Sequence, residues 1–177
     1  MKTEPGLLAA LAVLCLPLIA GGADGYFIPR IVTDEPPTVS FEIPRYAMTA
    51  IERDTVAACL VLEAASQGQP GMRGVMAVIR NRARGLPELF APTVLRERQF
   101  SAFNPITSGR ETLTHAIARA QHDRTWEVAV AIVDQALADT WNDPTGGATH
   151  YTRSGENIRW THVLAKTVTI GAHSFYR

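Results

Sequence analysis

The sequence predicts an α+β domain in which helices come first and a small antiparallel sheet forms the C-terminal part. Two observations support this prediction. Between residues 54 and 138, apolar side chains recur at helical spacing, interrupted by Gly and Pro. After the turn-forming stretch DPTGG at 143–147 the period changes, and apolar residues alternate with Thr and Gly over 167–172, as in a strand.

The first predicted helix begins at Asp54 or Thr55, either of which can cap it, and ends before the break QGQP at 67–70. Its apolar residues fall on every face, which is typical of a helix buried in a core. A second helix starts with Pro70 in its first turn and ends at Gly85. Three arginines near its end are expected to be a solvated basic terminus: Arg80, Arg82 and Arg84.

The remaining elements are shorter. Prolines make the pattern irregular over 86–109, where we expect loops and short turns. Two further helices are predicted at about 111–121 and 125–138. Strand character follows in ATHYT, 148–152, and in KTVTIGAHSFYR, 166–177.

The composition limits the classes of function that the chain can have. A chain of 177 residues, 46% hydrophobic and 19% charged, is ordinary for a soluble globular protein with a core. Seventeen Lys and Arg balance seventeen Asp and Glu, so no basic surplus indicates a nucleic-acid partner. The two cysteines, Cys15 and Cys59, form neither a disulfide framework nor a CxxC motif. The five histidines show no metal-ligand spacing, and we expect no metal and no cofactor.

The N-terminus indicates export. Residues 6–23 carry no charge, and 1–23 is predicted to be an export signal or a weak membrane anchor. Small residues at 21–23 suit cleavage; as a retained anchor the segment is at the short end of the about 17–25 residues that span a bilayer. Residues 24–50 contain four prolines and are predicted to be a linker, which leaves 51–177 as the folded domain. We therefore expect the protein in the periplasm or cell envelope.

One carboxylate stands out. Between Asp54 and Arg73, Glu63 is the only Asp, Glu, Lys, Arg or His, and it shares a helix face with Cys59 and Leu60. We therefore expect its carboxyl to lie against apolar side chains, where burial disfavours the charged form. A carboxyl that keeps its proton near neutral pH is suited to general-acid chemistry. The alternative is a Glu near a helix end that reaches water or pairs with a downstream arginine.

Four segments in the same order resemble the motifs of the SleB-type cell-wall hydrolases, a family that includes spore-cortex-lytic enzymes and endolysins. They are TVAACLVLEAASQGQPGMRGVMAVIRNRA, RQFSAFN, DPTGGATHYT and TIGAHSFYR. The resemblance covers about residues 54–177. It implies a lysozyme-like or lytic-transglycosylase-like fold that acts on the glycan strands of peptidoglycan, with Glu63, in the family's "EA" dipeptide, as the catalytic residue.

The number of carboxylates bears on the reaction. Two-carboxylate glycoside hydrolysis needs a second Asp or Glu across the cleft. Asp143 is expected to cap its turn, and Asp139 and Glu156 are interpreted as exposed loop residues. A lytic transglycosylase needs only one carboxylate, because the muramic acid C6 hydroxyl closes a 1,6-anhydro ring. This reaction is therefore preferred; a muramidase or glucosaminidase hydrolase and a non-catalytic wall-binding protein are the alternatives.

Several polar and aromatic residues are candidates for saccharide contacts. The "QFS" stretch supplies Gln99, Phe100, Ser101 and Asn104, although the Phe100 ring is equally suited to the core. In a strand after the DPTGG turn, Thr149 and Tyr151 would share the cleft face and His150 would point away. Trp160 is a possible stacking platform or a buried core residue.

The cysteines raise one further hypothesis. Some phage endolysins are held inactive by a weakly hydrophobic anchor, and in a few an anchor cysteine takes part in a thiol switch near the active site. This chain resembles that arrangement in composition and in the positions of Cys15 and Cys59, one turn before Glu63. Transient membrane association through 6–23 follows from this hypothesis; the structural alternative for Cys59 is a small buried hydrophobe.

Overall fold

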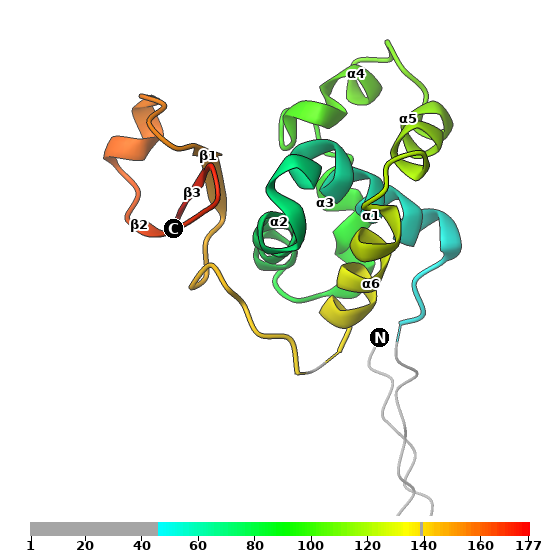
Figure 1. Cartoon of the computed structure of the whole chain (residues 1–177), viewed down its shortest axis with the longest axis horizontal. Helices are drawn as coiled ribbons and strands as arrows, with labels where there is room; N and C mark the ends of the chain where they lie inside the picture. Colours follow the sequence, from blue (N-terminus) through cyan, green and yellow to red (C-terminus); the bar gives the residue numbers. More distant parts are fainter. Residues whose placement is uncertain (1–45, 139) are drawn as a thin grey trace, which may run out of the picture. The chain divides into compact units, whose positions relative to one another are not determined.

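Helices precede strands in the computed structural model, which describes residues 46–138 and 140–177 (Figure 1). The predicted export segment and residues 24–45 of the predicted linker lie outside this description, as does Asp139. The α-helices are α1 (Ala50–Ala64), α2 (Gly68–Arg82), α3 (Phe90–Val94), α4 (Asn104–Thr107), α5 (Leu113–Gln121) and α6 (Trp126–Ala136). Short 3₁₀ turns are η1 (Ala65–Gln67), η2 (Pro87–Leu89), η3 (Ser101–Phe103) and η4 (Arg159–His162). The strands are β1 (His150–Arg153), β2 (Lys166–Ile170) and β3 (His173–Tyr176).

Helix α1 begins earlier than the sequence pattern predicted. Its N-cap is Thr49, whose hydroxyl accepts the Glu52 N–H at 3.4 Å, while the Glu52 carboxylate accepts the Thr49 N–H at 2.9 Å. This reciprocal capping box satisfies two backbone donors at once. The prediction that Asp54 or Thr55 caps the helix is therefore wrong. Both lie inside it, and the Thr55 hydroxyl donates to the Ile51 carbonyl at 2.6 Å.

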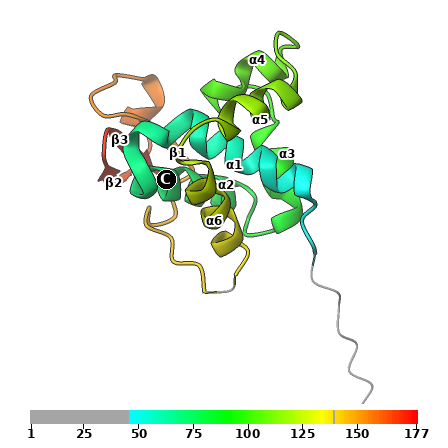
Figure 2. The same ribbon diagram turned by 45° about the vertical axis from the view of Figure 1, so that its right-hand side comes forward.

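Helix α1 is the centre of the helical part, as its apolar surface predicted. Every residue from Thr55 to Val61 is buried, and α2, α3, α5 and α6 all pack against the helix. Figure 2 shows these helices gathered around α1. Because the partners come from all sides, α1 has no polar face over this stretch. Its last turn, which carries Glu63, emerges from this packing.

The other helices confirm most of the predicted pattern. Helix α2 has Pro70 in its first turn, and Gly85, at φ +76°, follows its end and donates to the Arg80 carbonyl at 2.9 Å. Helices α5 and α6 lie within the predicted ranges. The region predicted as irregular contains α3, whose buried Phe90 and Val94 pack one turn apart against α1. Five residues are too few for a periodic pattern to indicate a helix.

The three strands form one antiparallel sheet in the order β1-β3-β2. The stretch 166–177, predicted to have strand character, is two strands joined at Gly171, where φ is +57°. Tyr151 of β1 pairs with Phe175 of β3, and the buried Phe175 ring packs with Val78 of α2. This contact sets the sheet against the helices.

The DPTGG turn anchors β1 to α2. One oxygen of the Asp143 carboxylate accepts the N–H and hydroxyl of Thr145 at 2.7 and 2.6 Å; the other accepts the Asn81 side-chain amide and the Gly147 N–H, both at 2.9 Å. Burial raises the pKa of Asp143, but these donors outweigh it and the net pKa is lowered. The expectation that Asp143 caps its turn is confirmed.

Candidate functional site

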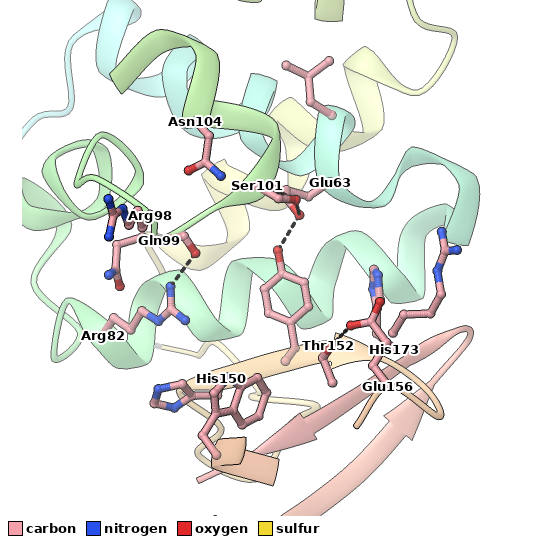
Figure 3. Close-up of a pocket in the computed structure, with 14 residues that line it drawn as sticks. Glu63, Arg82, Arg98, Gln99, Ser101, Asn104, His150, Thr152, Glu156 and His173 are labelled. Carbon is pink, nitrogen blue, oxygen red and sulfur yellow. Dashed lines mark hydrogen bonds between the residues drawn. The ribbon is translucent and has the colours of Figure 1, made fainter. Parts of the chain in front are cut away.

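Glu63 lines two pockets, one between the helices and the sheet and one within the helical part. The larger, of about 660 Å³, is lined by Leu62, Glu63, Arg82, Arg98, Gln99, Ser101, Asn104, His150, Tyr151, Thr152, Arg153, Glu156, Trp160 and His173. Figure 3 shows Glu63, Ser101 and Asn104 on the helical side and His150, Thr152 and His173 on the sheet side. The second, of about 510 Å³, shares Leu62 and Glu63 with the first and continues to Arg119 and Arg124.

The Glu63 carboxylate is held by hydrogen-bond donors from two directions. Its Oε1 accepts the Ala102 backbone N–H at 2.7 Å, and its Oε2 accepts the Tyr151 hydroxyl at 2.7 Å. The Ser101 hydroxyl lies 3.2 Å from Oε1 and 3.4 Å from Oε2. The sequence pattern predicted apolar neighbours for this carboxyl and did not indicate these polar donors. The buried apolar residues lie beneath it in α1, whereas η3 and β1 bring polar donors over its end.

Tyr151 holds its hydroxyl toward Glu63 because its ring is fixed by packing. The ring centroids of Phe175, His173 and Phe100 lie 5.7, 5.2 and 6.5 Å from that of Tyr151. Burial, and next the charge of Glu63, raise the pKa of Tyr151 well above its usual range. The phenol therefore remains protonated and can act as a hydrogen-bond donor at neutral pH.

The structure places most of the sequence-predicted contact residues on the larger pocket. Gln99, Ser101, Asn104 and Trp160 all line it. The Oδ1 atom of Asn104 is buried and has no hydrogen-bond partner among the described residues, which leaves an acceptor for a ligand. The Trp160 ring packs against His150 and Tyr176, with centroids 5.3 Å from each.

Two predicted contacts are not on the pocket. Phe100 is 2% exposed and belongs to the core, which was its alternative role. Thr149 precedes β1, its hydroxyl lies 2.9 Å from His150 Nδ1, and it does not line the pocket, while His150 does. The predicted alternation failed here because the strand begins only at His150. Burial, and next the charge of Arg82, lower the pKa of His150.

Glu156 is exposed and lies in a loop, as the sequence predicts, and it also lines the larger pocket. Its carboxylate lines the same pocket as Glu63 and accepts a hydrogen bond from the Thr152 hydroxyl (Figure 3). The residue is exposed, and no sequence pattern linked it to the pocket. His173 was also missed; its Nδ1 atom is buried without a partner among the described residues, and burial lowers its pKa.

Arg82 is also part of the pocket, although it was expected to be a solvated helix end. Its Nε donates to the Thr149 carbonyl at 2.7 Å and its Nη1 to the Gln99 carbonyl at 3.1 Å (Figure 3). The guanidinium lies over the Phe100 ring, 5.1 Å from its centroid. The residue therefore joins α2 to the segments that precede η3 and β1, a role that only the tertiary structure shows.

The described part of the chain offers neither a metal-binding cluster nor a membrane-spanning helix. No cluster of three His, Cys, Asp or Glu side chains there could hold a metal ion. Across residues 46–138 and 140–177, no helix combines the length and hydropathy needed to cross a bilayer. Cys59 is a buried free thiol whose pKa is raised by burial, so it is not poised as a nucleophile.

The chain is similar to known cell wall hydrolases in sequence and in fold. A family model described as cell wall hydrolase matches residues 66–176, a range that begins just after Glu63. The catalytic domain of the germination-specific lytic transglycosylase SleB from Bacillus anthracis has a similar structure, with a TM-score of 0.55 and 23% identity over 76% of this chain and 100% of that one. The catalytic domain of SleB from Bacillus cereus gives 0.54 and 23% over 74% and 93%. Among curated proteins, no sequence matches this chain. The predicted α+β, lysozyme-like fold is confirmed.

Proposed function

The chain belongs to the cell wall hydrolase family and is a peptidoglycan-degrading enzyme, and from this premise we propose that it is a lytic transglycosylase with Glu63 as its one catalytic acid and base. The observation that carries the proposal is the position of Glu63. Its carboxylate is oriented by a backbone amide and lies where two pockets meet. A glycan strand that occupies both pockets would pass its scissile bond across this carboxylate.

The hydrogen bonds assign different tasks to the two carboxylate oxygens. Oε1 faces the Ala102 N–H, which can only donate, so this oxygen remains an acceptor. Oε2 faces the Tyr151 hydroxyl, which can donate or accept as the carboxyl changes its protonation state. Oε2 is therefore the oxygen that exchanges protons.

The reaction then needs one residue and no added water. Glu63 donates its proton from Oε2 to the glycosidic oxygen, and the bond from that oxygen to muramic acid C1 breaks. The resulting carboxylate removes the proton of the C6 hydroxyl, whose oxygen attacks C1 and closes the 1,6-anhydro ring. This second proton transfer restores the acid for another cycle.

Pocket residues other than Glu63 are suited to hold the sugar. The unpartnered Oδ1 of Asn104 can accept from an N-acetyl N–H or a hydroxyl, and the half-buried Trp160 offers a ring face for stacking. Gln99 and Ser101 add donors and acceptors at the same wall. These groups bind and orient the strand, while Tyr151 orients the carboxylate.

A hydrolase is the second candidate, and Glu156 is the observation that favours it. This carboxylate lines the same pocket and was not expected there. A hydrolase would use it to activate water or to attack C1. Glu156 is exposed and engaged by Thr152, and it lies beside His173 in Figure 3, so we prefer the single-residue mechanism.

The test uses purified cell wall and the variants Glu63→Gln and Glu156→Gln. We expect Glu63→Gln to lower the clearing rate roughly 10²–10⁴-fold, the usual contribution of a general acid, with an unchanged thermal midpoint. Clearing that survives this substitution would sink the catalytic role and favour a wall-binding protein. Mass spectrometry of the released muropeptides decides the reaction: anhydro ends support the transglycosylase, while reducing ends that are lost in Glu156→Gln establish the hydrolase.

A further inference from the structure

Arg82 carries a charge into the larger pocket without a direct ion pair to a carboxylate of the described residues. Its two hydrogen-bond acceptors, the carbonyls of Thr149 and Gln99, are neutral. Among the described residues, no Asp or Glu forms an ion pair with it. Burial lowers the pKa of Arg82, and the charge of Glu63, in the same pocket, opposes this only weakly. Half-buried charges of this kind are usually paired, so a partner from outside the chain would complete the site.

A second cation lies at the same end of the pocket. Figure 3 shows Arg98 beside Gln99, whose carbonyl accepts the hydrogen bond from Arg82. Its side chain is 86% exposed, and its only ion pair in the described part of the chain is with the adjacent, exposed Glu97 at 3.3 Å. An exposed pair of this kind contributes little stability, so Arg98 can exchange it for a ligand.

The other charged residues of the two pockets include acidic groups or cations that have acidic neighbours. The acidic Glu156 lies with His173 and Thr152 at the opposite end in Figure 3, and the charges of Arg153 and Glu156 both act on the pKa of His173. In the second pocket, Arg119 forms an ion pair with Glu111 at 3.3 Å, and Arg124 lies beside Asp123 in sequence. The end formed by Arg82 and Arg98 is therefore the part of the cleft best suited to an anion.

We propose that Arg82 and Arg98 bind a carboxylate of the stem peptide that muramic acid carries through its lactyl group. This inference rests on the proposed function, because it assumes that a glycan strand lies in the pocket. The sugar rings are neutral and need no cation, whereas stem peptides have free carboxylates, and guanidinium groups bind carboxylates through paired N–H donors. The enzyme then prefers strands whose peptides are charged.

The experiment compares native cell wall with the same wall after carbodiimide coupling to ammonia, which converts the peptide carboxylates to carboxamides and leaves the glycan intact. For the wild type, we expect kcat/KM to be about tenfold higher on the native wall, and this preference to shrink as salt screens the charges. Arg98→Gln should reduce the ratio of kcat/KM on native wall to kcat/KM on amidated wall at least about threefold. This is the effect expected when a partly exposed ion pair is lost. Arg110→Gln is the matched control, because Arg110 is an exposed arginine outside both pockets whose side chain donates a hydrogen bond to the nearby Ser108 hydroxyl.

The outcomes separate this inference from the proposed function. If the wild type cleaves neither wall, the proposed function fails. Cleavage of both walls with equal kcat/KM, or an unchanged preference in Arg98→Gln, overturns the carboxylate site and leaves the function intact. Arg82→Gln should lose more of the preference than Arg98→Gln, and its thermal midpoint shows whether the lost backbone contacts unfold it; if they do, Arg98→Gln alone decides.

Discussion

At the scale of single residues, Glu63 shows that a sequence can indicate a candidate without indicating the groups that contact it. Its isolation in an apolar run identified it, and the structure places it at the junction of two pockets. The same run did not show that Ala102, Ser101 and Tyr151 would supply donors to it. These residues lie 38 to 88 positions away in sequence, so local spacing could not reveal them.

The Tyr151 hydroxyl offers a test of how the carboxylate is positioned. We expect Tyr151→Phe to lower kcat roughly 10- to 100-fold, because a hydrogen bond to a charged group contributes about 1.5–3 kcal/mol. KM and the thermal midpoint should change little, since the ring keeps its packing against Phe175 and His173. Steady-state kinetics on purified wall together with thermal unfolding measure both effects.

Tyr46→Phe is the matched control for this substitution. It also removes a tyrosine hydroxyl that donates to a carboxylate, Glu52, at 2.6 Å, but at the start of α1 and away from both pockets. We expect it to leave kcat unchanged. Equal effects of the two substitutions on kcat would show that Tyr151 has no special role in orienting Glu63.

At the scale of elements, long and regular segments were predicted well and short ones were not. The periodic patterns of α1, α2, α5 and α6 were sufficient because each helix has two or more turns in contact with the core. The short α3 and α4 have too few residues for a period. The division of the last strand segment into β2 and β3 depends on Gly171, which joins the two strands at positive φ.

The contact between α2 and the sheet depends on Gly74. A Cβ atom at this position would lie 2.5 Å from Cζ of Phe175. Judged by helix propensity alone, Gly74→Ala would stabilise α2 by about 1 kcal/mol. We instead expect destabilisation of about 1–3 kcal/mol, measured by denaturant unfolding, because the Phe175 ring must move. Activity should also fall, since Phe175 packs against Tyr151.

A double-mutant cycle identifies the steric origin of this effect. Phe175→Leu removes the ring that the new methyl group would meet. It also leaves a cavity where the ring was, which by itself is destabilising. We expect the double variant Gly74→Ala, Phe175→Leu to be more stable than the sum of the single changes predicts. Strict additivity would mean that the two positions do not clash, and the proposed reason for Gly74 would be wrong.

At the scale of the whole molecule, the site and the overall charge give different information. Equal numbers of acidic and basic residues give no net charge, yet this balance does not show the two arginines at one end of the pocket. A net charge is a sum over the chain, whereas recognition depends on which charges the fold brings together.

The substrate of this family lies outside the cytoplasmic membrane, so the proposed function requires export. We expect residues 1–23 to direct it and to be removed near Ala23, because an uncharged segment is followed by small residues. Mass spectrometry of the exported protein measures the mature N-terminus. Recovery of the full-length chain from membranes would instead support the anchored form and the thiol-switch hypothesis for Cys15 and Cys59.

The sequence by itself determined the order of helices and strands, the burial of α1, the turn cap at Asp143 and the candidate Glu63. These features depend on local spacing, capping and turn chemistry, which neighbouring residues encode. Only the tertiary structure decided that Tyr151 and Ala102 hold Glu63, that Glu156 and Arg82 share its pocket, and that Phe100 and Thr149 do not. Those relations join distant segments, and their positions follow from packing, which no local pattern contains.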